Sequence, residues 1–316
     1  MKRTIVTIKI IIFLNLIFFT SFAQEPIVLK TTTGEIKGTL SLPEKRKDLT
    51  LVLLISGSGP TDRDGNGYAG DNNSLKFLAE ELNKNGIASV RFDKRGIAES
   101  KDAVNDESEL RFDTYVNDVK QWIEMLSDEK KYSKIIIAGH SEGSLIGMIA
   151  AFKNKKVNAF ISIAGAGRPA DEIIKEQFVK VPQKVKDIIF PLLDKVKKGD
   201  SIPNVPPMLS ALFRPSIQPY MTSWFKYDPQ IEIKKLNIPI LIIQGSTDIQ
   251  VTENDAELLA KAQPSAKKKI ITNMNHVLKD CDTKDKEAQA PIYSNSELPL
   301  NKDFVIEMLS FIKKIK

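Results

Sequence analysis

Residues 135–147 read Ile135-Ile136-Ile137-Ala138-Gly139-His140-Ser141-Glu142-Gly143-Ser144-Leu145-Ile146-Gly147. The apolar run at 135–138 predicts a buried strand, and the small and apolar residues from Ser144 onward predict a helix that packs closely on a sheet. Between them stands a Gly-x-Ser-x-Gly pentapeptide, whose two glycines let strand and helix pass without a collision at Cβ. This context predicts a sharp turn that holds Ser141 in a strained conformation with its hydroxyl exposed, rather than a glycine-rich turn with an ordinary surface serine.

Strands and helices alternate on both sides of this turn. Because the strands are apolar throughout, the alternation predicts a mostly parallel sheet with helices on both faces. Two β-rich runs near the N-terminus, joined at Thr33-Gly34, predict an antiparallel edge to that sheet. Chemical groups are then expected at the carboxyl ends of the parallel strands. The expected strands cover 27–30, 35–42, 51–55, 87–92, 134–138, 159–163, 240–244 and 269–271, and the expected helices 74–83, 112–126, 144–152, 254–261 and 304–312.

Residues 168–236 interrupt the alternation. They contain many prolines, which exclude a central strand and break long helices. Helical stretches are expected at 171–179 and 185–198, with a break or kink at Pro191. The segment predicts a helical lid that covers the strand ends and shapes a pocket, and a structural crossover without a role in substrate choice is the alternative.

The first 23 residues differ in kind from the rest. Three basic residues precede or flank an apolar run at 10–19, and small residues follow up to Ala23. This order predicts a signal peptide over 1–23 and a mature domain over 24–316 that is secreted or periplasmic. The apolar run is short for a bilayer, so an uncleaved anchor is the less favoured alternative and no membrane span is expected after cleavage.

Composition and charge exclude several classes of protein. The 316 residues are 42% hydrophobic and 27% charged, as in ordinary globular proteins. Removal of the signal takes away three of the 46 basic residues and none of the 40 acidic ones, which lowers the formal charge from +6 to +3. The lysine clusters at 45–47 and 267–269 lack interleaved aromatic residues, so no nucleic-acid binding is expected. Cys281 is the only cysteine, which excludes an internal disulfide and a cysteine-based metal site.

A serine hydroxyl is a poor nucleophile at neutral pH and needs a base, most often an imidazole. The chain has two histidines. His140 is adjacent to Ser141, so its side chain is expected to project to the opposite side and to support the turn. His276 follows the last predicted strand, in a loop at the active edge of the sheet, and is therefore the predicted base.

The imidazole needs an acid that fixes its tautomer. Asp248 lies just past the strand at 240–244 and is the predicted acid, and the order Ser141, Asp248, His276 is that of a Ser…Asp…His triad. A turn or helix-cap role is the alternative for Asp248. Asp255 and Asp280 are rivals, but Asp255 is expected inside a helix and Asp280 lies close to His276 in the chain.

Acyl transfer also needs hydrogen-bond donors for an oxyanion. The backbone N–H of Glu142 is one predicted donor, and the loop at 56–65 should supply the second, from Ser58 or, as a near alternative, Gly59. This loop lacks the ending of a phosphate-binding loop. Its charged residues either contact substrate or form an ion-paired turn: Asp62, Arg63 and Asp64.

Over residues 27–316 the sequence resembles the α/β-hydrolase superfamily. The resemblance is carried by Gly139-His140-Ser141-Glu142-Gly143, Gly245-Ser246-Thr247-Asp248, Asn275-His276 and Phe92-Asp93-Lys94-Arg95-Gly96. The segment Gly57-Ser58-Gly59-Pro60-Thr61-Asp62-Arg63-Asp64-Gly65 is similar to that of bacterial carboxylesterases grouped with serine aminopeptidase-like hydrolases. Many members have His-Gly where Ser56-Gly57 stands here. Asp93 and Arg95 are expected to brace the sheet end.

The resemblance implies an α/β-hydrolase fold and hydrolysis of carboxylic esters through an acyl-enzyme, with no metal or organic cofactor. The hypothesis is a secreted serine carboxylesterase that acts on a small-molecule or polymer-linked ester. One alternative is an aminopeptidase-like peptidase, which needs an acidic anchor for the substrate amine, such as Glu142 or a lid carboxylate. A catalytically silent ligand-binding protein is the other. Dehalogenase and epoxide hydrolase chemistry is disfavoured because serine, not aspartate, occupies the nucleophile position.

Overall fold

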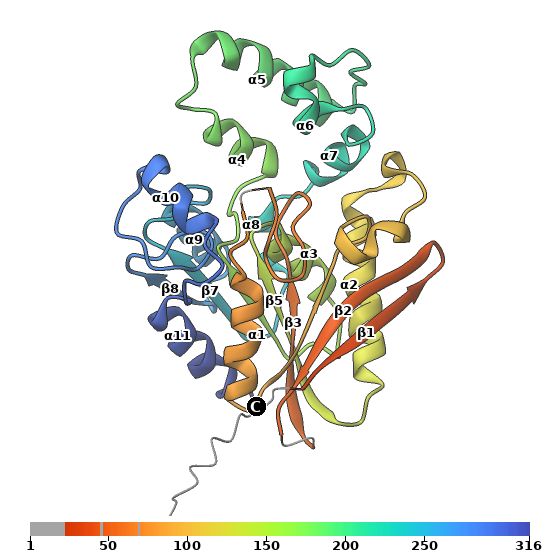
Figure 1. Ribbon diagram of the computed structural model, residues 1–316, viewed down its shortest axis with the longest axis vertical. Helices are drawn as coiled ribbons and strands as arrows, with labels where there is room; N and C mark the ends of the chain where they lie inside the picture. The colour runs from red at the N-terminus through yellow and green to blue at the C-terminus, as the bar shows by residue number, and fades with distance from the viewer. Residues whose placement is uncertain (1–22, 45–46, 69) are drawn as a thin grey trace, which may run out of the picture.

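The computed structural model describes residues 23–44, 47–68 and 70–316 (Figure 1). Eight strands form one sheet in the order β1-β2-β4-β3-β5-β6-β7-β8. The hairpin β1–β2 is antiparallel and β2 pairs antiparallel with β4, whereas β3 to β8 are parallel. The predicted mostly parallel sheet with an antiparallel N-terminal edge is therefore confirmed. The strands are β1 (Ala23–Thr31), β2 (Gly34–Leu42), β3 (Leu49–Ile55), β4 (Ala88–Phe92), β5 (Tyr132–His140), β6 (Ala159–Ile163), β7 (Ile240–Gly245) and β8 (Lys267–Ile271).

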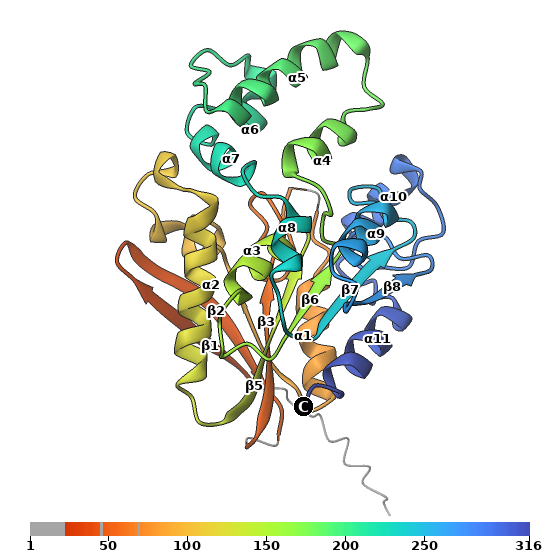
Figure 2. The ribbon, with the colours of Figure 1, turned by 180° about the vertical axis from the view of Figure 1, so that it is seen from behind.

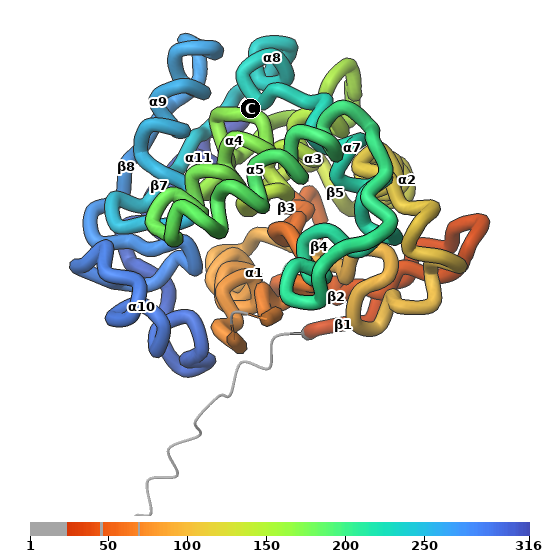
Figure 3. Tube along the Cα trace, turned by 90° about the horizontal axis from the view of Figure 1, so that it is seen from above, coloured from red at the N-terminus to blue at the C-terminus, as the bar shows by residue number. Residues whose placement is uncertain are grey.

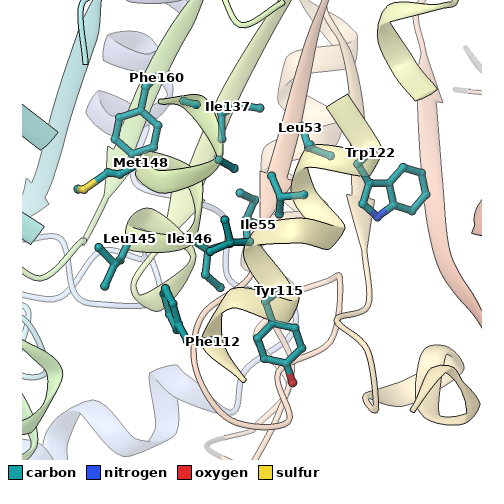
Figure 4. Close-up of a cluster of buried hydrophobic side chains, with 14 of the residues drawn as sticks. Leu53, Ile55, Phe112, Tyr115, Trp122, Ile137, Leu145, Ile146, Met148 and Phe160 are labelled. Carbon is teal, nitrogen blue, oxygen red and sulfur yellow. The ribbon is translucent and has the colours of Figure 1, made fainter. Parts of the chain in front are cut away.

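Helices cover both faces of this sheet because successive side chains of a strand point to opposite faces. In β3, Leu51 and Leu53 join one hydrophobic core, while Val52 and Leu54 join the other. The first core packs against α2 (Phe112–Ser127), α3 (Glu142–Ala151) and α9 (Glu253–Ala262), which lie in front of the sheet in Figure 2. Figure 4 shows the part of it between α2, α3 and the central strands. The second core packs against α1 (Ser74–Lys84) and α11 (Lys302–Ile312).

The segment between β6 and β7 is helical, and most of it stands above the carboxyl ends of the strands (Figures 1 and 3). Its last helix, α8 (Pro229–Lys234), instead packs against α3 and α9 in the body of the domain. The raised part comprises α4 (Ala170–Gln177), α5 (Gln183–Lys198), the 3₁₀ turn η3 (Pro207–Leu209), α6 (Ser210–Phe213) and α7 (Gln218–Trp224).

The structure differs from the sequence-based expectation in helix α5 and in three helices that were not expected. Of the break or kink expected at Pro191, the break is excluded, because helix α5 continues through this residue; the missing N–H removes one bond of the helical ladder. Helix α10 (Lys286–Tyr293) and the 3₁₀ helices η1 (Ala98–Ala103) and η2 (Glu107–Glu109) were not expected. The predicted signal peptide lies, apart from Ala23, outside the described residues. In the part of the chain that the structure describes, no helix has the length and apolar character of a membrane span.

Candidate active site

Ser141 occupies the predicted turn between β5 and α3. Its backbone angles, φ 54° and ψ −121°, are unfavourable for a residue with a Cβ, and its N–H donates a 2.9 Å hydrogen bond to the carbonyl of Ile163. A Cβ on Gly139 would lie 2.1 Å from the carbonyl oxygen of Gly143, and one on Gly143 would lie 2.4 Å from that of Ile55. Both positions therefore require glycine. The turn is strained because α3 folds back in close contact with β5 and β3.

His276 and Asp248 meet at the same edge of the sheet. Nδ1 of His276 lies 2.7 Å from Oδ2 of Asp248, and both side chains are buried. The loops that carry them touch, because the N–H of Thr247 donates to the carbonyl of Met274 at 3.2 Å. A carboxylate only accepts hydrogen bonds, so Nδ1 carries the proton and Nε2 is left as the basic nitrogen.

Further hydrogen bonds hold the carboxylate of Asp248. Its Oδ1 accepts from the backbone N–H groups of Gln250 at 2.8 Å and Val251 at 3.0 Å, and its Oδ2 also accepts from Gln244 Nε2 at 2.9 Å. The turn-capping role that was the alternative for Asp248 is thus present together with the contact to His276. This set of donors fixes the carboxylate in one orientation, which in turn fixes the imidazole.

His140 links the turn of Ser141 to the loop of His276. Its Nε2 lies 2.9 Å from the carbonyl oxygen of His276, and the two rings lie 4.7 Å apart between centroids. Since a carbonyl accepts, Nε2 of His140 carries its proton. Among the described residues no hydrogen bond joins Ser141 to His276, so His140 is the direct bridge between the two loops. It packs and supports the turn, as the sequence predicted.

The buried site keeps His140 neutral. Burial, together with the neighbouring His276, lowers the pKa of His140 to about 3. A histidine in an unfolded chain titrates near pH 6.5, so between about pH 6.5 and 3 the unfolded state binds more protons than the folded state. Stability must therefore fall as the pH falls through this window. Between pH 6.5 and 4.5 the free energy of unfolding should fall by about 2–3 kcal/mol more in the wild type than in His140→Gln.

Urea unfolding at the two pH values measures this difference. Glutamine retains an N–H for the carbonyl of His276 but has no proton to gain. Equal losses in wild type and His140→Gln would show that His140 is not the titrating group.

The segments that carry the two predicted oxyanion donors adjoin Ser141. Glu142 is the first residue of α3, where the backbone N–H groups of the first turn have no partner within the helix. A Cβ on Gly57 would lie 3.2 Å from the Cβ of Ser141, so the loop after β3 passes directly over the serine, and Ser58 follows Gly57 in the chain. The loop that carries Ser58 and Gly59 is therefore next to Ser141, and the assignment of Ser58 and Glu142 as oxyanion donors stays a prediction.

The charged residues of the loop at 56–65 are engaged within the protein. Asp62 Oδ1 accepts from the N–H groups of Asp64 and Asn66, Arg63 Nε donates to Asp93 at 3.1 Å, and Arg91 Nε donates to Asp64 at 2.6 Å. Of the two interpretations, the ion-paired turn is the one that the geometry favours.

Residues with other expected roles are also partnered. Arg95 Nε donates to Asp118 at 2.9 Å, and Asp93 holds Arg63, so both brace the sheet end. Asp255 lies in α9 and pairs with Arg168 at 2.9 Å, and Asp280 accepts from Asn301 Nδ2 at 2.6 Å. Neither rival carboxylate takes the place of Asp248 beside His276.

Sequence reasoning missed the side-chain partners of Glu142. Its carboxylate is buried and accepts from Nζ of Lys94 at 2.8 Å and from the hydroxyl of Tyr220. The only available signal was a lysine two residues after the end of the buried strand β4, within Phe92-Asp93-Lys94. Nothing in the sequence pairs it with a residue 48 positions later.

Comparison with known proteins agrees with this architecture. The profile of the family described as "Serine aminopeptidase, S33" matches residues 66–212. Esterase EstD of Thermotoga maritima is 27% identical over 266 residues, which cover 82% of this chain and 60% of that protein. The chain thus spans about 60% of the length of this curated relative.

Solved structures share the fold at low sequence identity. The esterase Pf2001 of Pyrococcus furiosus superposes with a TM-score of 0.60 at 15% identity, over 93% of this chain and 92% of that one. Est1E of Butyrivibrio proteoclasticus, solved with ferulic acid, gives a TM-score of 0.61 at 17% identity, over 91% of this chain and all of that one. These structures show that the chain has an α/β-hydrolase fold. The family model and the curated relative that it resembles in sequence are a serine aminopeptidase-like family and an esterase.

Proposed function

We propose that the protein is a serine carboxylesterase. The observation that carries this proposal is the 2.7 Å contact between His276 and Asp248 at the sheet edge where Ser141 stands in a strained turn. A nucleophile, a base and an acid that orients the base are the three groups needed for acyl transfer. The named esterase relative supports the same reaction class.

The roles follow from the protonation states. Nε2 of His276 takes the proton of Ser141 as the hydroxyl oxygen attacks the ester carbonyl carbon. The carbonyl oxygen becomes an oxyanion, which the N–H groups of Ser58 and Glu142 stabilise. His276 then gives the proton to the leaving alkoxide, which departs as the alcohol. A water molecule, deprotonated by His276, attacks the acyl-enzyme and releases the acid and Ser141.

An observation on Glu142 separates the ester reaction from its closest alternative. A peptidase that removes N-terminal residues needs a free carboxylate to bind the substrate amine. Both oxygens of Glu142 already accept hydrogen bonds, from Lys94 and Tyr220. The anchor would have to be another carboxylate, so the site favours esters over aminoacyl amides.

The proposal has two further parts, which concern substrate selection and the location of the protein. Residues 168–236 act as the helical lid, with α4 to α7 above the strand ends, and its inner side selects the substrate. Residues 1–23 act as a signal peptide that directs the domain at 24–316 to the periplasm or the medium. Release of the chain without its first 23 residues, read by N-terminal sequencing, tests the second part.

The proposal predicts a preference for esters over amides. We expect kcat/KM for p-nitrophenyl acetate or butyrate to exceed that for alanine p-nitroanilide by about 100-fold or more, equivalent to about 3 kcal/mol of transition-state stabilisation. Initial rates on both substrate types with the same preparation measure the ratio. A ratio in favour of the anilide would instead support the peptidase.

A panel of natural esters would then define the substrate class. Acyl chains of increasing length, acetylated polysaccharide and feruloylated polysaccharide sample small and polymer-linked esters. The ferulic acid bound to Est1E makes the feruloyl arm a useful comparison.

A further inference from the structure

A buried polar network lies beneath the nucleophile. Nζ of Lys94 donates to Oε2 of Glu142 at 2.8 Å and to the carbonyl oxygen of Gly57 at 2.5 Å. The hydroxyl of Tyr220 donates to Oε1 of the same carboxylate. The side chains of Lys94 and Glu142 are each only 2% exposed. A buried ion pair of this kind is costly to desolvate, so it is weak evidence for stability and calls for another role.

The contact to Gly57 determines the direction of a predicted oxyanion donor. The carbonyl of Gly57 and the N–H of Ser58 belong to one planar peptide group, and the described chain has no cis peptide bond. In a trans peptide the C=O and N–H point in opposite directions. Lys94 holds the oxygen of Gly57, so the N–H of Ser58 points away from Lys94. The ammonium charge also strengthens the dipole of this peptide group.

The other end of the network carries the second donor. Glu142 supplies its own backbone N–H at the start of α3, while its side chain pairs with Lys94. One ion pair thus ties together the two segments that carry the predicted oxyanion donors. Their separation is a property that an oxyanion site must hold within a fraction of an ångström.

We propose that Lys94 is a positioning residue for the oxyanion site, and that Tyr220 makes the geometry of that site depend on the docking of helix α7. The inference rests on the proposed function. Neither side chain touches the substrate carbonyl; both act through Gly57 and Glu142.

The environment of Tyr220 explains how the lid is coupled to the network. Burial and the charge of Glu142 raise the pKa of Tyr220, so the hydroxyl remains a donor. Its ring packs edge-on against Tyr115 at 5.4 Å, and Lys94 lies 5.2 Å from the centre of that second ring. On the same helix, Trp224 stacks on Phe112 of α2. Helix α7 is therefore docked on α2 in the position that brings the hydroxyl to Glu142.

The test uses the variant Lys94→Met, which keeps the length of the side chain and removes its donors. We expect kcat for p-nitrophenyl acetate, per active site titrated with a fluorophosphonate, to fall by about 10²–10³-fold, the usual effect of losing one oxyanion donor. KM should change by less than about threefold, because the loss is in the transition state. A trifluoromethyl ketone should lose affinity by about the same factor as kcat/KM, because addition of the Ser141 oxygen to its carbonyl gives a hemiketal whose oxyanion occupies the site.

Arg95→Met is the matched control for loss of a buried ion pair. Arg95 is buried, pairs with Asp118 and adjoins Lys94 in the chain, but its side chain touches neither Gly57 nor Glu142. It should lower the melting temperature and leave kcat per titrated site and the affinity of the ketone near their wild-type values. A purely structural role for Lys94 predicts the same behaviour for Lys94→Met.

Two more variants keep the inference testable if Lys94→Met does not fold. In Lys94→Met/Glu142→Gln no buried charge is left unpaired, yet the donor to Gly57 is still missing, so the same loss of kcat is expected. Tyr220→Phe removes only the hydroxyl and should lower kcat by about three- to tenfold, with a parallel change for the ketone.

The outcomes separate this inference from the proposed function. Wild-type kcat and ketone affinity per active site in Lys94→Met or in the double variant would overturn the role of Lys94, and an unchanged Tyr220→Phe would overturn the coupling to α7. A wild-type chain without esterase activity would overturn the proposed function and, with it, the positioning role.

Discussion

Ser141→Ala is expected to lower kcat for p-nitrophenyl butyrate by at least about 10⁴-fold. In the proposed reaction the hydroxyl oxygen forms the bond to the acyl carbon, so neither His276 nor Asp248 can replace it. The variant should fold, because alanine fits the space of serine and because none of the hydrogen bonds that hold the turn uses the side chain of Ser141. Steady-state kinetics and circular dichroism on the same preparation measure both effects.

Ser141→Gly is the informative companion. The φ of 54° at this position is unfavourable for serine and alanine but costs glycine little. We expect the glycine variant to be equally inactive and about 1 kcal/mol more stable than Ser141→Ala. Appreciable turnover in either variant would mean that another residue is the nucleophile.

Asp248→Asn is expected to lower kcat by about 10⁴-fold while leaving the fold intact. The amide oxygen can still accept from the N–H groups of Gln250 and Val251, which preserves the turn. The amide nitrogen, however, would face Nδ1 of His276 as a donor. The imidazole would then place its proton on Nε2, where it can no longer accept a proton from Ser141. Kinetics on the ester substrate measure the loss.

Asp280→Asn is the control for Asp248→Asn. Asp280 also lies near His276 in the chain, but its carboxylate accepts from Asn301. An amide oxygen can replace that acceptor, so near wild-type kcat is expected. If Asp280→Asn were the more damaging of the two substitutions, the assignment of the acid would be wrong.

Much of the fold could be predicted because the pattern of the strands is simple. The central strands are buried on both faces, so they appear in the sequence as uninterrupted apolar runs such as Ile135-Ile136-Ile137. Helices α1 and α2 show one apolar face each, which places their boundaries within one or two residues of the prediction. The strained turn at Ser141 could be predicted because two glycines leave only one way for α3 to pass over β5.

The parts that could not be predicted depend on contacts between distant residues. The sequence predicts a role chiefly for the backbone of Glu142. The contacts of its side chain could not be predicted, because Lys94 and Tyr220 are 48 and 78 residues away and no local pattern joins them to it. Helix α10 is polar, contains Pro291 and gives no periodic signal. Its Gln289 instead donates to the carbonyl of Thr247, beside the predicted acid, so its structure depends on that tertiary contact.

We propose Ser141 as a nucleophile activated by His276. The most direct test of this proposal is reaction of the full-length chain with a fluorophosphonate, followed by peptide mapping of the adduct. We expect one adduct, on Ser141, which forms in the wild type and is lost or greatly slowed in His276→Ala with the fold unchanged. No adduct on a folded wild-type chain, or an adduct on another residue, would contradict it.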